Sequence, residues 1–114
     1  MKILLAPSET KSSGGEYLSF NQESFLFPKL YEHRQEILQT YQEHVNKGSI
    51  KDLSKLFGLK KEQQIKSFKN NIFTLPTKKA IERYTGVAFD YLDYASLQKE
   101  EQTYLDKNLL LFSN

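Results

Sequence analysis

The sequence predicts a mixed α/β protein, in which a small sheet is packed against several helices. Ile3-Leu4-Leu5 near the start and residues 109–112 near the end are continuous apolar runs, too short for helices and suited to strands buried on both faces. Between them, apolar residues recur at helical spacing in segments bounded by capping residues and glycines. The predicted order is strand, three helices, strand, two helices, strand, which is typical of a mixed architecture.

The first half of the chain is predicted to open with a strand and to continue as helices. Pro7 ends the strand because proline has no N–H to donate to a ladder, and residues 17–27 show no clear periodicity. Pro28 is expected to open a helix at its first turn, and Gly48 follows the end of that helix. The residues expected to share its apolar face are Leu30, Ile37, Leu38, Tyr41 and Val45.

Two short helices are predicted next. Ser49 is suited to cap a helix that carries an aspartate in its first turn and stops at Gly58. Another helix is expected over about residues 60–70. The apolar residues expected to point inward from this last segment are Leu59, Ile65 and Phe68.

The remainder returns to strand and helix in alternation. Residues 75–77 contain a proline and form a break, after which residues 80–84 are predicted to be a second strand. Residues 87–92 read as a short helix, and Ser96 is expected to cap a final helix. Residues 109–112 are then the third strand.

The composition narrows the classes of function. The 114 residues include no cysteine, which excludes disulfides, thiolate metal sites and cysteine nucleophiles. His33 and His44 stand eleven residues apart, too far along a helix to bind one metal, so we expect no metal or other cofactor. No run approaches the length of a membrane span, and the apolar start is too short for a signal peptide. We therefore expect a soluble, cytoplasmic protein that does not associate with membranes.

The charge is unevenly distributed along the chain. Residues 49–84 hold nine Lys or Arg and three Asp or Glu, a net of +6, whereas residues 1–48 stand at −1 and residues 85–114 at −3. A basic middle segment can form a local positive face although the whole chain carries only +2.

The basic segment also contains a pattern that resembles a helix-hairpin-helix element, over about residues 49–70. A short helix, the glycine Gly58 and a second helix follow one another, and such a glycine lets backbone amides approach a phosphate. Contacts of this kind would bind DNA without reading its sequence. An ordinary helix pair with a solvated lysine face accounts for the same residues. The candidate nucleic-acid-binding residues are Lys51, Lys55, Lys60, Lys61, Lys66 and Lys69.

A second candidate site lies where the first strand ends. Polar residues follow Pro7 directly, at the carboxyl end of a strand, where open α/β sheets place ligands. If strands 3–5 and 80–84 share one sheet, Lys11 comes toward Arg83 and Asp90, and two cations with several hydroxyls would favour a small anion such as phosphate or carboxylate. The candidate ligand-binding residues are Ser8, Glu9, Thr10, Lys11 and Thr85, and the candidate catalytic residues are Ser8, Lys11, Arg83, Tyr84 and Asp90. The alternative is a solvated loop with incidental polarity.

Two segments resemble a known family. Residues 5–15, Leu-Ala-Pro-Ser-Glu-Thr-Lys-Ser-Ser-Gly-Gly, are similar to the opening motif of the YaaA (peroxide stress protein) family, and residues 83–97 are similar to its second hallmark. The resemblance implies DNA binding through a helix-hairpin-helix element and a role in limiting iron-dependent peroxide damage. Members of the family are much longer, so the chain looks like the N-terminal portion of a larger single-domain fold whose C-terminal half is absent.

These observations leave functions of different classes open. One is a DNA-binding stress protein that is not an enzyme, which the resemblance and the lysines favour. The other is an enzyme or small-anion-binding protein, which the chemistry of the Ser8–Lys11 loop favours. A third is that this half of the protein is inactive alone. A steep dependence of DNA binding on salt would favour the first.

The apolar run at residues 109–112 also predicts self-association. If the cover for this strand lies beyond residue 114, an edge or apolar patch of the sheet stays exposed and invites pairing with another copy. We therefore expect association through edge strands or exchanged elements, and marginal stability as a monomer. Sedimentation at low concentration measures this, and a cooperative monomer without an apolar patch would contradict it.

Overall fold

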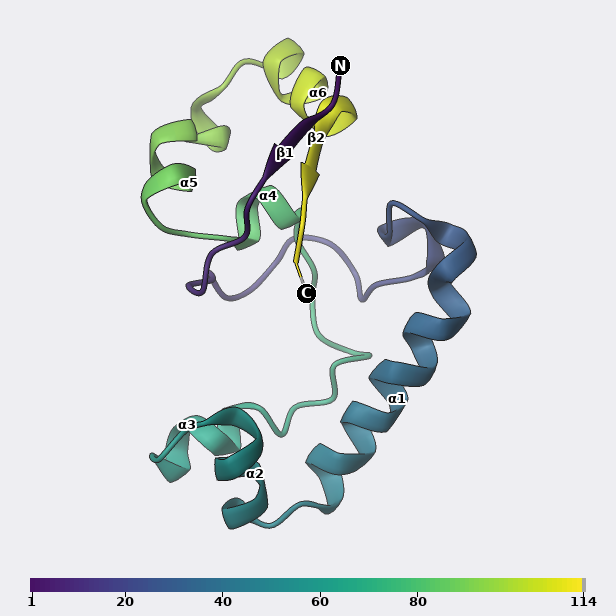
Figure 1. The fold of residues 1–114 in the computed structure, drawn as a ribbon, viewed down its shortest axis with the longest axis vertical. Coiled ribbons are helices and arrows are strands. Elements are labelled where there is room, and N and C mark those ends of the chain that lie inside the picture. The colour runs from purple at the N-terminus through teal and green to yellow at the C-terminus, as the bar shows by residue number, and fades with distance from the viewer. Residues whose placement is uncertain (114) are drawn as a thin grey trace. The chain divides into compact units, whose positions relative to one another are not determined.

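The structure is a computed structural model that describes residues 1–113, shown in Figure 1. The mixed α/β class predicted from the sequence is confirmed: the described residues form six α-helices, three short 3-10 helices and a two-stranded parallel sheet. The chain divides into two compact units. We call residues 1–17 with 77–113 the sheet unit and residues 18–76 the helical unit.

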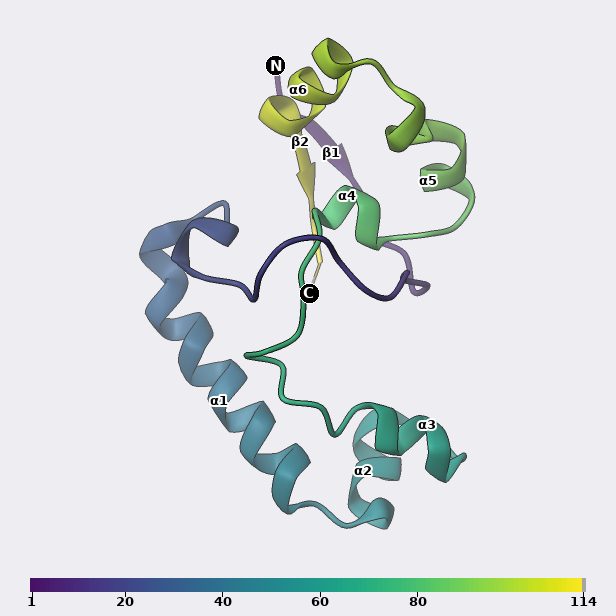
Figure 2. The ribbon, with the colours of Figure 1, turned by 180° about the vertical axis from the view of Figure 1, so that it is seen from behind.

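The sheet unit is built on the pairing of the chain's first and last strands. β1 (Ile3–Leu5) lies parallel to β2 (Leu109–Leu111), with Ile3 opposite Leu109 and Leu5 opposite Leu111. Figures 1 and 2 show the two strands side by side from opposite directions. Two of the three predicted strands are therefore confirmed, but the strand that pairs with residues 3–5 is 109–111 and not the predicted 80–84.

One face of this sheet packs against the core of the sheet unit. Leu5, Leu109 and Leu111 pack against a core made by Ile81, Phe89 and Tyr94. Leu4 points the other way and is 66% exposed, and Phe112 is 63% exposed. The prediction that residues 3–5 are buried on both faces is wrong for Leu4, whose side of the strand is exposed. The exposed face is what the prediction of self-association requires, and self-association itself stays a prediction.

The predicted strand at residues 80–84 is wrong, because this segment forms the one-turn helix α4 (Ala80–Arg83). Its Ile81 is buried and Tyr84, three residues on, packs against the same core, a spacing that suits a helix and not a strand. Alanine, glutamate and arginine in the turn also favour helix. Tyr84 itself is extended and makes a single antiparallel bridge with Lys11.

The other helices of the sheet unit follow the prediction closely. α5 (Val87–Leu92) occupies the predicted residues, a 3-10 turn covers Tyr94–Ser96, and α6 (Lys99–Asn108) precedes β2. The predicted cap is wrong: Gln98 caps α6, its N–H donating to the Glu101 carboxylate at 2.8 Å, and the Ser96 hydroxyl donates to the Asp93 carbonyl instead.

The helical unit contains the three predicted helices. The 3-10 turns Gln22–Ser24 and Pro28–Leu30 precede α1 (Tyr31–Lys47), which is followed by α2 (Ile50–Phe57) and α3 (Glu62–Ser67). Val45, Leu53 and Ile65, one from each helix, form its buried core.

The expected apolar faces are confirmed only in part. Ile37, expected on the inner face of α1, is 63% exposed, and Phe68, expected to point inward, is 44% exposed. α2 and α3 pack only against the C-terminal part of α1, around Val45, so its earlier apolar residues lack the same cover.

A buried polar residue of α1, Gln42, holds the segment that follows α3. Its side-chain oxygen accepts a hydrogen bond from the Ile72 N–H at 2.8 Å.

A partly buried polar network ties together the elements of the sheet unit. The Lys79 ammonium donates to Tyr94 Oη at 2.9 Å and to Asp106 Oδ2 at 2.6 Å, and Tyr94 Oη donates to Asp106 Oδ1 at 2.8 Å. Tyr94 is only 6% exposed. The hydrogen bond to Asp106, then that to Tyr94, raises the pKa of Lys79. Burial acts to raise the pKa of Asp106, but the hydrogen bonds from Lys79 and Tyr94 outweigh it and hold that pKa below its usual range.

Replacing Asp106→Asn should lower the free energy of unfolding by about 1 kcal/mol near neutral pH, a value reduced for the partial exposure of the ion pair. The native carboxyl takes up its proton at a lower pH than the unfolded one. The Asp106 carboxylate therefore makes its full contribution to the free energy of unfolding above the ordinary aspartate pKa of about 3.9. This contribution is lost as the pH falls through the lowered pKa of the native state. Urea unfolding at several pH values measures this, with Glu100→Gln on the same helix as the control. A difference between wild type and Asp106→Asn that stays constant on acidification would contradict it.

Candidate functional site

The Ser8–Lys11 loop lies directly beside the segment that joins α4 to α5. The Ser12 N–H donates to the Arg83 carbonyl at 2.7 Å, and the Thr85 N–H donates to the Thr10 carbonyl at 3.1 Å. The Thr10 hydroxyl donates to the Thr85 carbonyl, also at 3.1 Å. The predicted proximity of the loop to Thr85 is thus confirmed, although an isolated bridge produces it and not a shared sheet.

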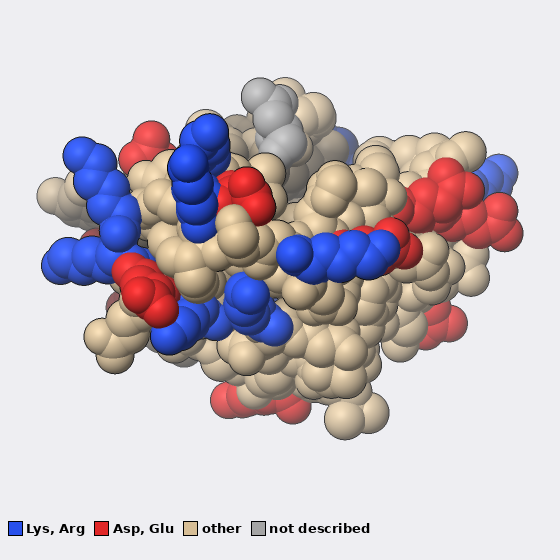
Figure 3. All heavy atoms as spheres, turned by 90° about the horizontal axis from the view of Figure 1, so that it is seen from below, with Lys and Arg blue, Asp and Glu red and all other residues tan. Residues whose placement is uncertain are grey.

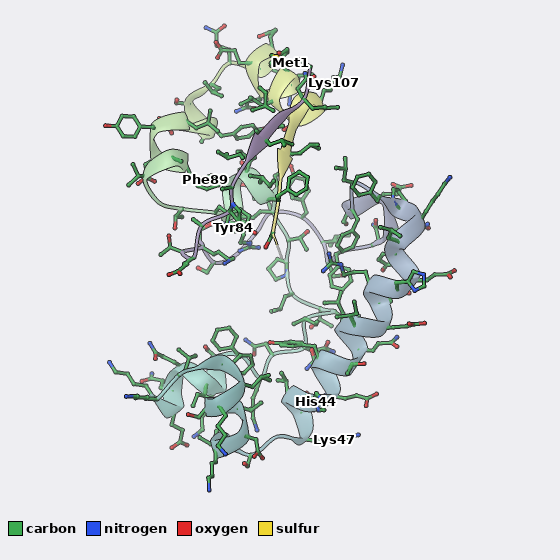
Figure 4. The ribbon with its side chains drawn as sticks, viewed as in Figure 1. Met1, His44, Lys47, Tyr84, Phe89 and Lys107 are labelled. Carbon is green, nitrogen blue, oxygen red and sulfur yellow. The ribbon has the colours of Figure 1, made fainter. Side chains whose placement is uncertain are left out.

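The two cations of this candidate site are engaged by backbone carbonyls. The Lys11 ammonium donates to the carbonyls of Ser8 at 3.3 Å and Glu9 at 3.2 Å, and the Arg83 guanidinium donates to the Ser12 carbonyl at 2.7 Å. Lys11 also lies 5.2 Å from the centre of the Tyr84 ring, which stacks on Phe89 (Figure 4). These contacts stabilise the loop and engage two of the three N–H donors of Lys11 and one of the five of Arg83.

The remaining predicted residues of this site are Ser8, Glu9 and Asp90. The Ser8 hydroxyl donates to the Thr10 carbonyl at 2.8 Å, within the loop itself. Glu9 is exposed. Asp90 lies in the first turn of α5, and within residues 1–113 it makes no hydrogen bond or ion pair with Lys11 or Arg83. The expected approach of Lys11 to Asp90 stays a prediction. A catalytic or ligand-binding role for these residues stays a prediction.

Gly86 connects the loop contact to α5. Its φ of +114° is a backbone conformation that side chains with a Cβ rarely adopt. A Cβ at this position would lie 3.6 Å from Thr10 Oγ1 and 3.8 Å from Ser8 Cβ, ordinary contact distances. Glycine is therefore required by the backbone conformation and not by lack of space.

The sequence did not predict a polar hollow of about 280 Å³ on the sheet unit. Its lining residues are Gly15, Glu16, Tyr17, Lys78 and Glu82. The Lys78 ammonium donates to Ser12 Oγ at 3.1 Å, and Tyr17 forms a two-way backbone bridge with Thr77. The Gly14-Gly15 pair is the feature of the sequence that could have indicated this hollow, since paired glycines often mark a close approach of two backbone segments. In the structure, a Cβ on Gly15 would lie 2.2 Å from the Thr77 carbonyl oxygen.

The second candidate site, the lysine face, is formed by α2, α3 and the turn between them. Ser49 caps α2 as predicted: its hydroxyl accepts from the Asp52 N–H at 3.2 Å, and the Asp52 carboxylate accepts from the Ser49 N–H at 3.2 Å. The hydrogen bonds to Ser49 lower the pKa of Asp52. Gly58, at φ +65° and ψ +24°, ends α2 in a left-handed turn, as the sequence indicated.

The six lysines of this face are all exposed. Lys66 pairs with Glu62 at 2.7 Å, an interaction that lowers the pKa of Glu62, and the Lys69 ammonium donates to the Gly48 carbonyl at 3.3 Å. Within residues 1–113, the other four lysines make no ion pair or side-chain hydrogen bond, and the backbone N–H groups of Lys60 and Lys61 have no acceptor. In Figure 3, blue side chains stand out on the left, where Figure 1 places α2 and α3.

These features define a small mixed α/β protein that carries an exposed basic helix pair. The chain matches the family described as peroxide stress protein YaaA over residues 1–114, and it belongs to that family. The family resemblance seen in the two sequence motifs is therefore confirmed. Among the described residues, no helix is both long and apolar enough to cross a membrane.

Curated relatives are longer than this chain. An uncharacterized protein of Campylobacter jejuni is 41% identical over 114 residues, which make up 100% of this chain and 46% of the relative. A UPF0246 protein of Corynebacterium glutamicum is 35% identical over 88% of this chain and 40% of its own length. One from Malacoplasma penetrans is 30% identical over 99% of this chain and 44% of its own length. The chain thus spans about half the length of these relatives and matches their N-terminal half. No solved structure matches it.

The close packing of Gly15 against Thr77 predicts that a side chain at this position lowers the stability of the sheet unit. Gly15→Ala should destabilise the sheet unit by about 1–3 kcal/mol, because the new methyl group meets the Thr77 carbonyl and forces apart the bridge to Tyr17. Gly14→Ala is the matched control: its site has open space, and only its φ of +76° opposes the change. Denaturant unfolding compares the two. A Gly15→Ala variant that is no less stable than Gly14→Ala would contradict the observed packing.

Proposed function

We propose that the chain binds DNA without sequence preference through the lysine face of α2 and α3. In this way it would serve the peroxide stress role for which its family is named, by limiting iron-dependent damage to the bound DNA. The observation that carries the proposal is the exposure of six lysines on one helix pair, four of them without a partner in the described residues.

The charge of the element supports binding to phosphates. Residues 49–70 contain six lysines and only two acidic residues, Asp52 and Glu62. Asp52 is engaged by the cap of α2, and Glu62 neutralises Lys66 alone. The remaining cations are free to replace the counterions of DNA, and releasing those ions is the main source of affinity in non-specific binding.

The turn at Gly58 adds donors suited to a phosphate. The N–H groups of Lys60 and Lys61 are available, and Gly58 keeps side-chain atoms away from the turn, with open space where its Cβ would lie. Backbone and lysine contacts to phosphate position a protein on DNA and carry no base identity. These features support a helix-hairpin-helix role for residues 49–70.

The loop beside Thr85 supports an enzymatic or anion-binding function less well. Its Lys11 and Arg83 donate to carbonyl oxygens of the loop, which already satisfy part of their hydrogen-bonding capacity. An anion bound there would compete with these carbonyl oxygens for the N–H donors of Lys11, two of which are already engaged. The free lysines of α2 and α3 face no such competition.

The double variant Lys60→Glu/Lys61→Glu should weaken binding to every DNA sequence tested. Because each lost phosphate contact releases about one counterion fewer, the slope of log affinity against log salt should fall by about one unit per contact. Fluorescence anisotropy at several salt concentrations measures both quantities.

The matched control is Lys29→Glu/Lys99→Glu, which makes the same change in net charge at exposed lysines outside α2 and α3. This variant should retain most of its affinity. Equal losses in the two double variants would show that only the total charge matters and would refute a localised site. Unchanged affinity in Lys60→Glu/Lys61→Glu, with folding intact, would make α2 and α3 a solvated helix pair.

A further inference from the structure

An aromatic ring is exposed on the same helix pair as the lysines. Phe68, at the end of α3, is 44% exposed although it is a large apolar residue. Its ring stacks on Phe57 with 4.7 Å between ring centres and 24° between planes. Phe57 is supported in turn by the edge of Tyr41, whose ring centre is 6.3 Å away. The Phe68 ring is therefore held in place from behind.

Phe57 covers one face of this ring. The opposite face and the edges are the parts of the ring that can contribute to the 44% exposure of Phe68. Lys66 and Lys69 stand two residues before it and one after it, and both are exposed. A supported aromatic face among cations is the combination by which proteins bind single-stranded nucleic acid, with the ring stacking on a base and the cations following the backbone.

We propose that Phe68 is a stacking platform for an unpaired base, so that the lysine face prefers single-stranded or locally opened nucleic acid to intact duplex. The inference rests on the proposed function, which supplies the phosphate contacts. In a duplex, each base is covered on both faces by its neighbours, whereas an unpaired base offers a free face to the ring. The contact reads no base identity, since every base has such a face.

The absence of tryptophan from the sequence provides a direct probe. Phe68→Trp introduces a single indole at the proposed contact, and Ile37→Trp places one at an exposed position of α1, outside the lysine face. On titration of the whole chain with an oligothymidine, we expect the emission of Phe68→Trp to be strongly quenched and that of Ile37→Trp to change little. A duplex with the same number of phosphates should quench Phe68→Trp much less.

Affinity measurements separate stacking from phosphate binding. Phe68→Leu keeps an apolar side chain against Phe57 but removes the flat ring, and circular dichroism establishes that it folds. We expect its affinity for the oligothymidine to fall about fivefold or more, the loss typical of one stacked base, with duplex affinity unchanged. Phe68→Tyr should restore single-strand binding.

The outcomes distinguish this inference from the proposed function. If Lys60→Glu/Lys61→Glu weakens binding while Phe68→Leu changes the affinity for neither single strand nor duplex, stacking is refuted and the lysine site stands. Equal losses for single strand and duplex in Phe68→Leu also refute stacking. If the wild-type chain binds neither ligand, both proposals fail. If Phe68→Leu instead abolishes a self-association of the chain without changing single-strand affinity, the ring belongs to a protein contact and the inference is wrong.

Discussion

The structure depends on the parallel pairing of β1 with β2, two strands separated by almost the entire chain. The pairing places Ile3 opposite Leu109. The chain between the two strands must therefore leave the sheet after β1 and return to it at β2. The pairing also orients the start of the chain so that the loop after β1 reaches Tyr84, where a single backbone bridge fixes it. The core formed by Ile81, Phe89 and Tyr94 packs against one face of these two strands.

The two candidate sites differ in what their cations do. In the loop after β1, the cations act as structural donors: Lys11 donates to carbonyls of its own loop, and Arg83 donates to the Ser12 carbonyl across the contact. On the helix pair, the cations are spread along exposed surface beside a turn that keeps its N–H groups available. This difference follows from local geometry, because a loop that doubles back offers carbonyls to a nearby lysine, whereas a helix engages its carbonyls internally.

Much of the fold could be predicted from the sequence, and the failures have physical causes. The short apolar runs at each end identified β1 and β2, and Ser49 and Gly58 marked the ends of α2 because their roles are local. The strand prediction for residues 80–84 failed because five residues with three apolar positions do not distinguish one helical turn from a strand. Phe68 was assigned to the core from its spacing, but whether a helix face is covered depends on distant segments, which periodicity does not reveal. The proximity of the Ser8–Lys11 loop to Thr85 was predictable from the sequence, whereas the contacts of Lys11 with backbone carbonyls were not.

The bridge between Tyr17 and Thr77 has a consequence for how such a protein could arise and be rebuilt. The chain enters and leaves the helical unit through these two residues, which already exchange backbone hydrogen bonds of 3.0 and 3.1 Å like the last pair of a hairpin. Residues 18–76 are thus topologically an insertion between paired ends. Geometrically, a short turn closing this pair would leave the backbone of the sheet unit continuous, and the excised segment could be grafted onto another hairpin as a transferable module.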